Sequence, residues 1–440
     1  MRLARLVALT VLAPMGVACS SGRAEPPGSA AQSSRPAQPS GIPAQSSRPA
    51  QPSGIIPAQC DPDDGGLVLP AGFCAVVVAR NIGAARHLVV APNGDVFVAT
   101  SGRMGGGVVA LRDTNGDGRA DVTRRFGPAS GNGIALHDGH LWFAPNDRVV
   151  RWRWAPGQLE PAGEAEVVVR DLPDASSHRA KSIAFGPGGA LFVHVGSPSN
   201  TCQASGGNPA PGKDPCDELA TRAGVWRFEP GRLGQSQADG RRWATGMRNA
   251  VALTSHPVTH ELWAAIHGRD RLSEWGSSDR DNAEKPAEEF GPVPEGADYG
   301  WPYCYYDPDL RRKVQAPEYG GDGSRIGRCA DKTLPAIAFP AHWAPNGAAF
   351  YDGTLFGGDY RGGVFVAFHG SWNRAPLPQA GYRVVFAPFR DGRAVGTWRD
   401  FAVARSGPTG FRPTGLAVGP DGSLYLAADR EETVWRVLRR

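Results

Sequence analysis

The feature that most constrains the fold of this chain is a phrase that occurs six times. Each copy contains a short run of small apolar residues, a turn with glycine, and a second run in which apolar residues alternate. Two strands joined by a short glycine turn form a β-hairpin. The copies begin at residues 88, 133, 182, 251, 347 and 415, and in the fifth copy an insertion delays the second strand until Val364. The chain is therefore expected to consist largely of hairpins.

The spacing of the copies favours one arrangement of these hairpins. The first two intervals are about as long as a bare four-stranded blade of roughly 40 to 50 residues, and the later intervals are longer. We therefore predict an all-β fold, a six-bladed β-propeller with insertions in its later blades. The ring would close by pairing of residues 75–79 with residues 433–437. A pair of β-sandwiches is the alternative fold, but it does not account for six copies.

The composition agrees with short strands and argues against several classes of function. The chain contains 58 glycines and 39 prolines among 440 residues, many of them in turn sequences such as Pro-Asp-Gly. Its net charge of +4 is too small to indicate binding to nucleic acid. The chain has no Gly-x-Gly-x-x-Gly on a strand–helix unit, no Gly-x-Ser-x-Gly and no His-Glu-x-x-His. These absences argue against a nicotinamide enzyme, a serine hydrolase and a zinc protease.

The N-terminus has the pattern of an export signal. Arg2 and Arg5 precede an apolar run that is too short to span a bilayer, so residues 1–18 are expected to be a signal peptide. The sequence Gly16-Val-Ala-Cys-Ser20 resembles a bacterial lipoprotein cleavage box, in which Cys19 would be lipidated. Ordinary cleavage after small residues is the alternative. The chain is expected to act at the periplasmic or extracellular face, anchored to the membrane by lipid.

A tether is expected to follow the signal peptide. Residues 19–59 are rich in Pro, Ser and Gln and contain a tandem 13-residue repeat that begins at Ala31 and again at Ala44. Such a segment has little apolar surface to bury, so we expect it to be disordered. The propeller would then occupy residues 60–440.

The cysteines agree with an exported protein. Six remain once Cys19 is assigned to lipid, and an even number in an exported chain favours disulfides. Other connectivities and a zinc site are alternatives, although the chain has no Cys-x-x-Cys motif. The local pairs are Cys60 with Cys74, Cys202 with Cys216, and Cys304 with Cys329.

One acidic stretch has the spacing of a calcium-binding loop. Asp113, Asn115, Asp117 and Asp121 would supply carboxylate and amide oxygens, and Gly118 would occupy the sharp turn. The stretch lacks the closing glutamate of an EF-hand. A structural calcium site is predicted, with an ordinary Asp/Gly loop as the alternative.

Five further phrases form an ordered set along the chain. They are Gly246-Met-Arg-Asn249, Trp263-Ala-Ala-Ile-His-Gly268, Asp298-Tyr-Gly-Trp-Pro302, Phe368-His-Gly-Ser-Trp-Asn-Arg374 and Phe411-Arg-Pro-Thr-Gly-Leu-Ala-Val418. From Cys60 onward, this set resembles the soluble glucose dehydrogenase and L-sorbosone dehydrogenase family. The resemblance implies a six-bladed propeller that carries pyrroloquinoline quinone (PQQ) and calcium.

The resemblance also implies a catalytic base. Oxidation of an aldose at its anomeric carbon removes a proton from the hydroxyl while a hydride leaves carbon, so a base must lie beside a bound quinone. His178 lies where this family keeps that base, and an imidazole titrates near working pH. Without the resemblance, a loop histidine bonded to its neighbours would be the simpler interpretation.

The cofactor ligands follow from the same resemblance. PQQ has three carboxylates and two quinone oxygens, which suit the planar, permanent charge of arginine. Arg248 and Asn249 match the family's Arg-Asn pair, in which the arginine would polarise the quinone oxygen and so take part in catalysis. Arg412 matches an arginine that holds a carboxylate, and Arg374 lies near another cation of the relatives. A solvated surface role is the alternative for any single arginine.

A second calcium ion is implied at the active site. Gly268 and Arg269 match the strand end whose backbone carbonyls hold this ion in the family, although the relatives have proline where this chain has Arg269. A Lewis acid at that place would make the quinone more electrophilic.

The sequence therefore predicts an exported PQQ- and calcium-dependent dehydrogenase that oxidises an aldose, a sorbosone-like sugar or a related aldehyde or alcohol. Its electrons would pass to a quinone or a cytochrome-type acceptor. A calcium-dependent propeller hydrolase of the lactonase type is one alternative, and it would need carboxylates converging on the central channel. A non-catalytic propeller that binds partners at the cell envelope is another.

Overall fold

The computed structural model describes residues 59–440, apart from residues 103–105, 129, 206–208 and 408. The predicted signal peptide, the lipidation site Cys19 and the tether up to residue 58 lie outside the described residues. Within the described residues, no helix is both long and apolar enough to cross a membrane.

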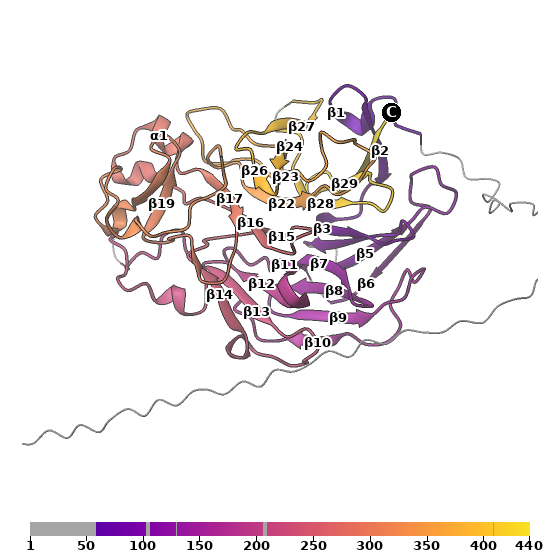
Figure 1. The fold of residues 1–440 in the computed structure, drawn as a ribbon, viewed down its shortest axis with the longest axis horizontal. Helices are drawn as coiled ribbons and strands as arrows, with labels where there is room; N and C mark the ends of the chain where they lie inside the picture. The colour runs from indigo at the N-terminus through magenta and orange to yellow at the C-terminus, as the bar shows by residue number, and fades with distance from the viewer. Residues whose placement is uncertain (1–58, 103–105, 129, 206–208, 408) are drawn as a thin grey trace, which may run out of the picture. The chain divides into compact units, whose positions relative to one another are not determined.

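Six sheets, each built on four antiparallel strands, make up the six blades of a β-propeller, which confirms the predicted fold class (Figure 1). The first blade contains β3 (Ala84–Val90), β4 (Val96–Ser101), β5 (Gly107–Arg112) and β6 (Val122–Phe126). The second contains β7 (Gly131–His137), β8 (His140–Pro145), β9 (Val149–Arg153) and β10 (Glu166–Val169). The third contains β11 (Ile183–Phe185), β12 (Leu191–Val195), β13 (Gly224–Phe228) and β14 (Arg241–Thr245).

The remaining blades follow the same pattern. The fourth contains β15 (Ala252–Ser255), β16 (Leu262–Ile266), β17 (Glu288–Pro292) and β21 (Ile337–Phe339). The fifth contains β22 (Pro345–Phe350), β23 (Val364–Phe368), β24 (Arg383–Ala387) and β27 (Arg399–Ala404). The sixth contains β28 (Pro413–Val418), β29 (Leu424–Ala428), β30 (Thr433–Arg439) and β2 (Phe73–Ala79).

Each repeated phrase forms the first two strands of a blade, as the pattern predicts. The first strands β3, β7, β11, β15, β22 and β28 contact one another in turn, and β28 contacts β3 to complete the circle. The delayed hairpin of the fifth blade pairs Phe350 with Val364. The predicted closure is also confirmed, because β2 pairs with β30 through Ala75 opposite Val437 and Val77 opposite Trp435.

The core lies between neighbouring blades. Phe97 and Ala99 of the first blade pack against Phe143 and Trp152 of the second, and all four are buried. Similar apolar clusters lie between the other blades. Since both faces of a central strand touch a neighbouring blade, runs such as residues 96–99 are buried throughout rather than alternately.

The fourth blade carries a long insertion between β17 and β21, as expected for a later blade. The insertion contains β18 (Ala297–Asp298), β19 (Cys304–Asp307) and β20 (Arg312–Gln315), and β18 extends the sheet of the third blade by pairing parallel to β14. The short helix α1 (Asp279–Glu284) precedes β17 and lies near β19 in Figure 1. The other short strands are β1 (Leu67–Val68), β25 (Phe389–Arg390) and β26 (Arg393–Ala394).

Single turns of 3-10 helix connect several strands. They are η1 (Asp64–Gly66), η2 (Pro187–Gly189), η3 (Asp217–Ala220), η4 (Gln237–Asp239), η5 (Leu272–Trp275), η6 (Pro317–Tyr319) and η7 (Gly327–Cys329). The three local cysteine pairs predicted from the sequence are all disulfides in the structure.

Candidate active site

Polar residues lie at one end of the blades. In each antiparallel hairpin, the residues just before the first strand and those just after the second strand lie side by side at this end. In the fourth blade the His267 N–H donates to the Asn249 carbonyl at 2.9 Å, and in the sixth the Asp429 N–H donates to the Arg412 carbonyl at 3.3 Å. The first strands form a closed circle. Residues at these strand ends in different blades therefore approach one another.

His178 lies in the loop before β11, and the end of the neighbouring strand β12 holds its imidazole. Its Nδ1 lies 2.8 Å from the carbonyl oxygen of Ser197. A carbonyl oxygen can only accept, so Nδ1 carries the proton and Nε2 carries a lone pair. Within the described residues, Nε2 makes no hydrogen bond. The approach depends on Gly196, because a Cβ at that position would lie 2.6 Å from the Cβ of His178.

The protonation state of His178 suits a base. Burial and, after it, the guanidinium of Arg248 lower the pKa of His178 to about 3, so this imidazole does not titrate near working pH as expected from its residue type. The imidazole is therefore neutral at working pH, with its Nε2 lone pair available. The backbone of His178 has a φ of +48°, in the left-handed region that costs energy for a residue with a side chain.

Arg248 precedes β15, and three fixed oxygens hold its guanidinium. Nη1 donates to the Gly268 carbonyl at 2.7 Å, Nη2 to Asp270 Oδ2 at 2.8 Å, and Nε to the Asn200 carbonyl at 3.3 Å. Both members of the Arg248–Asp270 pair are largely buried. Burial alone would raise the pKa of Asp270, but Arg248 and a hydrogen bond with His342 hold it well below its ordinary value. The pair is therefore ionised.

Asn249 lies beside His267, and one of its polar atoms has no partner. His267 Nε2 lies 3.0 Å from the Pro345 carbonyl, so Nε2 carries the proton and Nδ1 can accept from the Asn249 amide at 3.4 Å. Burial lowers the pKa of His267 to about 4. Oδ1 of Asn249 is buried and makes no hydrogen bond. An unsatisfied buried acceptor is costly, so Oδ1 would gain from a donor brought near it.

A second polar cluster lies at the ends of the fifth and sixth blades. His369 Nε2 lies 2.9 Å from Asp429 Oδ1, and Arg412 Nη1 lies 3.2 Å from His369 Nδ1. Asp429 accepts from the Nε2 of His369, and the Nδ1 of His369 lies where it can accept from the Arg412 guanidinium. Arg86 of the first blade also donates to Asp429, at 3.1 Å. One carboxylate thus joins three blades.

The two clusters belong to the same end of the propeller. His178, Arg248 and Arg412 come from the third, fourth and sixth blades, and the strand-end contacts above bring each of them to that end. The roles predicted for these residues stay predictions, but their placement agrees with them.

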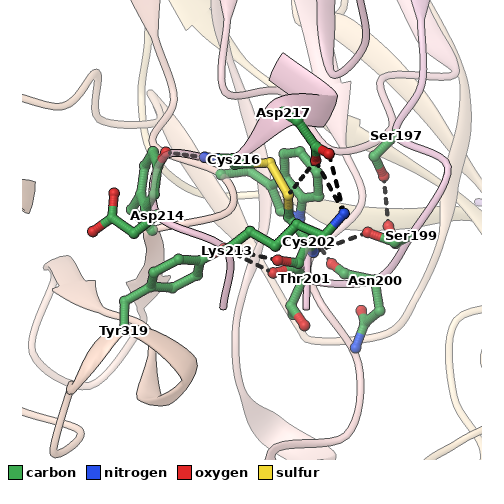
Figure 2. The surroundings of a disulfide bond; sticks show 12 residues. Ser197, Ser199, Asn200, Thr201, Cys202, Lys213, Asp214, Cys216, Asp217 and Tyr319 are labelled. Carbon is green, nitrogen blue, oxygen red and sulfur yellow. Dashed lines mark hydrogen bonds and ion pairs between the residues drawn. A yellow bond between two sulfur atoms is a disulfide. The ribbon is translucent and has the colours of Figure 1, made fainter. Parts of the chain in front are cut away.

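Figure 2 shows the loop that follows β12, which also reaches this end. Cys202 is joined to Cys216, and its N–H donates to Ser199 Oγ at 2.9 Å. Ser197 Oγ donates to the Ser199 carbonyl at 2.7 Å. The loop that holds His178 is thus tied to a disulfide.

Arg374 has a different environment from the other predicted cofactor ligands. Its guanidinium donates to the carbonyls of Ala283, Ala341 and Pro378. These carbonyls belong to the segments around α1 and the fifth blade. The neighbouring Asn373 instead contacts Asp270 Oδ1. A contact between Arg374 and a cofactor stays a prediction.

At the predicted calcium position, the polar groups of Gly268 and Arg269 are bonded to other residues of the protein. The Gly268 carbonyl accepts from Arg248, and its N–H donates to Glu288 Oε2 at 2.8 Å. The side chain of Arg269 is buried and donates to Glu318 Oε2 at 2.5 Å. A guanidinium already lies against the carbonyl that would bind the ion.

The predicted calcium loop is closed by its own hydrogen bonds. Asp113 accepts from the amides of Gly116 at 2.6 Å and Gly118 at 2.7 Å, and Asp121 accepts from Thr114. Asn115 and Asp117 likewise accept from amides two residues ahead. Calcium binding by this loop stays a prediction.

Converging metal ligands are scarce in the part of the chain that the structure describes. The one group of three candidate ligands there is Cys202, Cys216 and Asp217. Both sulfurs of that group are consumed by the disulfide. The carboxylates that a lactonase-type site would need in the central channel do not converge in this part of the chain.

Sequence reasoning missed several residues of the site: His267, Asp270, His369, Asp429 and Asn200. Three of them could have been found from the sequence. When the second strands of the repeats are aligned, the residue directly after each strand is polar in three blades: His267 after β16, His369 after β23 and Asp429 after β29. Asp270 and Asn200 lie in loops outside the repeats and have no such signal.

The amino-acid sequence of this chain is similar to a protein-family model and to several known proteins. A family model described as TrAA12-like matches residues 67–440. An uncharacterized protein of Borreliella burgdorferi is 28% identical over 200 residues, which cover 44% of this chain and 48% of that protein. The pyrroloquinoline quinone-dependent pyranose dehydrogenase of Coprinopsis cinerea is 27% identical over 238 residues, which cover 46% of this chain and 31% of that protein. The matches thus span less than half of each relative's length.

Solved structures share the fold. A Trichoderma reesei protein of carbohydrate-active enzyme family AA12 superposes with a TM-score of 0.72 at 18% identity, covering 85% of this chain and 98% of that one. The holo form of the PQQ domain of the C. cinerea pyranose dehydrogenase gives a TM-score of 0.70 at 20% identity, covering 88% and 99%. These likenesses support the six-bladed architecture.

Proposed function

This chain belongs to the TrAA12-like family, and from that premise we propose that it is a PQQ-dependent sugar dehydrogenase. The observation that carries the proposal is His178, a neutral imidazole whose tautomer is set by Ser197 and whose Nε2 is free, at the same end of the propeller as Arg248 and Arg412. Relatives with this fold include proteins named as PQQ-dependent or PQQ-bound sugar dehydrogenases.

The residues at this end suit PQQ by their donor chemistry. The three guanidinium groups of Arg86, Arg248 and Arg412 and the buried amide of Asn249 lie at the strand ends. Arginines match carboxylates, of which PQQ has three. The partnerless Oδ1 of Asn249 would accept from a donor group of the bound molecule. We propose that Arg248, Asn249 and Arg412 hold the cofactor.

The bound quinone would supply the electrophile that accepts a hydride from the sugar. His178 would accept the hydroxyl proton at Nε2, while its Nδ1–H stays bonded to Ser197. Arg248 is held rigidly by three oxygens, so it would stabilise negative charge that develops nearby without first reorganising. Asp270 keeps Arg248 in place.

Calcium is a further proposal, supported by the family resemblance alone. As the structure stands, the Gly268 carbonyl does not fit an ion, because Arg248 already donates to it and two cations would repel each other. The role of calcium is tested by adding a chelator and then restoring calcium during the assay described below.

The remaining parts of the proposal concern the surroundings of the enzyme. We propose an aldose or sorbosone-like sugar as substrate, because the relatives are named as sugar dehydrogenases. A quinone or cytochrome as acceptor is proposed from the family resemblance. Export and lipid attachment at Cys19 are supported by the N-terminal sequence. Labelling with radioactive palmitate, compared between the natural chain and a Cys19→Ser variant, tests the anchor.

The main experiment is reconstitution of the purified protein with PQQ and calcium, followed by dye reduction with a panel of aldoses. We expect PQQ-dependent turnover that His178→Ala lowers by about 100-fold or more, the usual contribution of a general base. His260→Ala is the matched control, because His260 also has a positive φ of +57° but is exposed in the turn between β15 and β16, at the opposite end of these strands from Asn249 and His267. No PQQ-dependent turnover with any sugar would refute the proposal.

A further inference from the structure

Asn200, in the loop after β12, connects three separate segments of the protein. Its side-chain amide bonds to the main chain of Asp270 at two points: Oδ1 accepts from the Asp270 N–H at 2.9 Å, and Nδ2 donates to the Asp270 carbonyl at 2.9 Å. Its own carbonyl accepts from Arg248 Nε at 3.3 Å and from Trp301 Nε1 at 2.8 Å. A single residue thus bonds to both members of the Arg248–Asp270 pair and to the insertion.

These contacts fix the direction of the guanidinium. An ion pair joined by one contact can swivel, whereas Arg248 donates in three directions to the carbonyls of Asn200 and Gly268 and to the Asp270 carboxylate. Two of those three acceptors depend on Asn200, one directly and one through the main chain of Asp270. The orientation of the guanidinium therefore depends on the position of Asn200.

The loop that carries Asn200 is itself anchored on both sides. On one side Ser197 N–H donates to the Arg248 carbonyl at 2.8 Å, and Ser197 bonds to His178. On the other side Cys202 is bound to Cys216 (Figure 2). The residue that holds Arg248 and the residue that holds His178 are thus only three positions apart in one anchored loop.

We propose that Asn200 is a positioning residue, which acts through Asp270 and Arg248 to hold the guanidinium at a fixed orientation relative to His178. The Cys202–Cys216 disulfide provides the rigid base from which Asn200 does so. The catalytic consequence rests on the proposed function, but the contact between Asn200 and Asp270 does not.

A double-mutant cycle tests whether Asn200 acts through Arg248. We expect Asn200→Ala to lower kcat by roughly 10- to 100-fold with a smaller change in KM, because misplacement of a catalytic group by about 1 Å has effects of that size. In an Arg248→Ala background, Asn200→Ala should have no further effect on kcat. Gln203→Ala is the control, since Gln203 lies in the same loop and, among the residues that the structure describes, its side chain bonds to Ala210 and not to Arg248 or Asp270. Equal effects in both backgrounds would overturn the proposal.

Hydrogen exchange tests the contact without any activity. The Asp270 amide should exchange at least 10-fold faster in Asn200→Ala than in the natural chain, and Gln203→Ala should leave it unchanged. Unchanged exchange in Asn200→Ala would refute the positioning contact even if the enzyme is active. Conversely, a natural chain that shows protected Asp270 but no PQQ-dependent turnover would refute the proposed function and leave the contact intact.

Discussion

The blades and the insertion of the fourth blade are held together by different forces. Neighbouring blades bury apolar side chains against each other, as Phe97 and Phe143 do. The insertion contains a disulfide, Cys304–Cys329, and is bonded to the rest of the protein by ion pairs with at least one buried member. These pairs are Arg269 with Glu318, Lys313 with Glu289, and Lys285 with Asp307.

The difference between apolar packing and ion pairing explains how the residues of the site keep their orientation. Apolar burial is non-directional and stabilises many packings almost equally. Ion pairs and hydrogen bonds require a defined geometry. Arg269 immediately follows Gly268, whose carbonyl holds Arg248, so the directional contacts occur where the position of the site must be fixed. The apolar contacts supply the bulk of the scaffold.

The largest expected effect comes from breaking one buried pair of the insertion. Glu318→Ala leaves the Arg269 charge buried without its carboxylate partner, and we expect a loss of about 3–5 kcal/mol in the free energy of unfolding. Replacing both residues, as Arg269→Met with Glu318→Leu, should restore most of that stability. Urea denaturation of the natural chain, Glu318→Ala and the double variant measures the free energy of unfolding of each.

A variant in a blade, Leu191→Ala, provides the comparison for the stability loss of Glu318→Ala. Leu191→Ala removes a fully buried side chain from the third blade and should cost about 2–5 kcal/mol while leaving the insertion in place. If the double replacement in the insertion is as unstable as Glu318→Ala alone, then packing rather than unpaired charge explains the loss.

Acid should weaken the blades before it weakens the insertion. Burial lowers the pKa of His87 and His267 to about 4 and of His178 and His194 to about 3. An unfolded histidine titrates near pH 6.5, so below that pH the unfolded chain binds protons that the folded chain does not. Stability is therefore full above about pH 6.5 and is lost as the pH falls toward 4.

The expected loss at pH 5.5 is roughly 1 kcal/mol for each of these histidines, or a few kcal/mol together. Residues 297–336 contain no histidine, so the insertion should not share this response. Denaturant unfolding at pH 7.5 and 5.5, with hydrogen exchange to locate the change, checks the prediction. Equal destabilisation of both regions would contradict it.

The smallest expected effect on stability comes from the contact between Gly196 and His178. In Gly196→Ala, the new methyl group would overlap the Cβ and carbonyl oxygen of His178, so we expect a cost of about 1–3 kcal/mol. The displaced imidazole should also lower kcat by about 100-fold. Gly231→Ala is the matched control, since nothing lies within 4 Å of a Cβ there. Unchanged kcat would show that His178 need not sit against Gly196.

Much of the scaffold was predictable from local patterns. The hairpin phrases predicted the first two strands of each blade, and the alternating runs at both ends of the domain predicted the pairing of β2 with β30. The cysteine pairs were predictable because each pair is close in sequence. The hairpins and disulfides depend on residues close in sequence, which the sequence displays directly, whereas the ring closure was predicted from strand patterns at opposite ends of the domain.

The partners of individual side chains were harder to predict. Arg374 and Arg412 lie in similar arginine-containing phrases, yet one guanidinium lies against backbone carbonyls and the other against His369. Asn200 and Asp270 are single polar residues in loops, and nothing in their neighbourhood predicts that they meet. An arginine's length and rotamer freedom allow many partners, so its contacts follow from the folded surroundings.

The sequence by itself determined the repeating hairpins, the closure of the ring, the disulfides and the membership of a family. The hairpins and disulfides follow from periodic burial and from short-range covalent constraint, which a linear chain encodes locally, and the closure follows from two strand patterns that begin and end the domain. Only the tertiary structure decided that His178 is neutral with Nε2 free, that Arg248 is shared among Asn200, Gly268 and Asp270, and that one carboxylate, Asp429, joins three blades. Protonation and orientation depend on burial and on atoms from distant segments, and those exist only once the blades have closed into a ring.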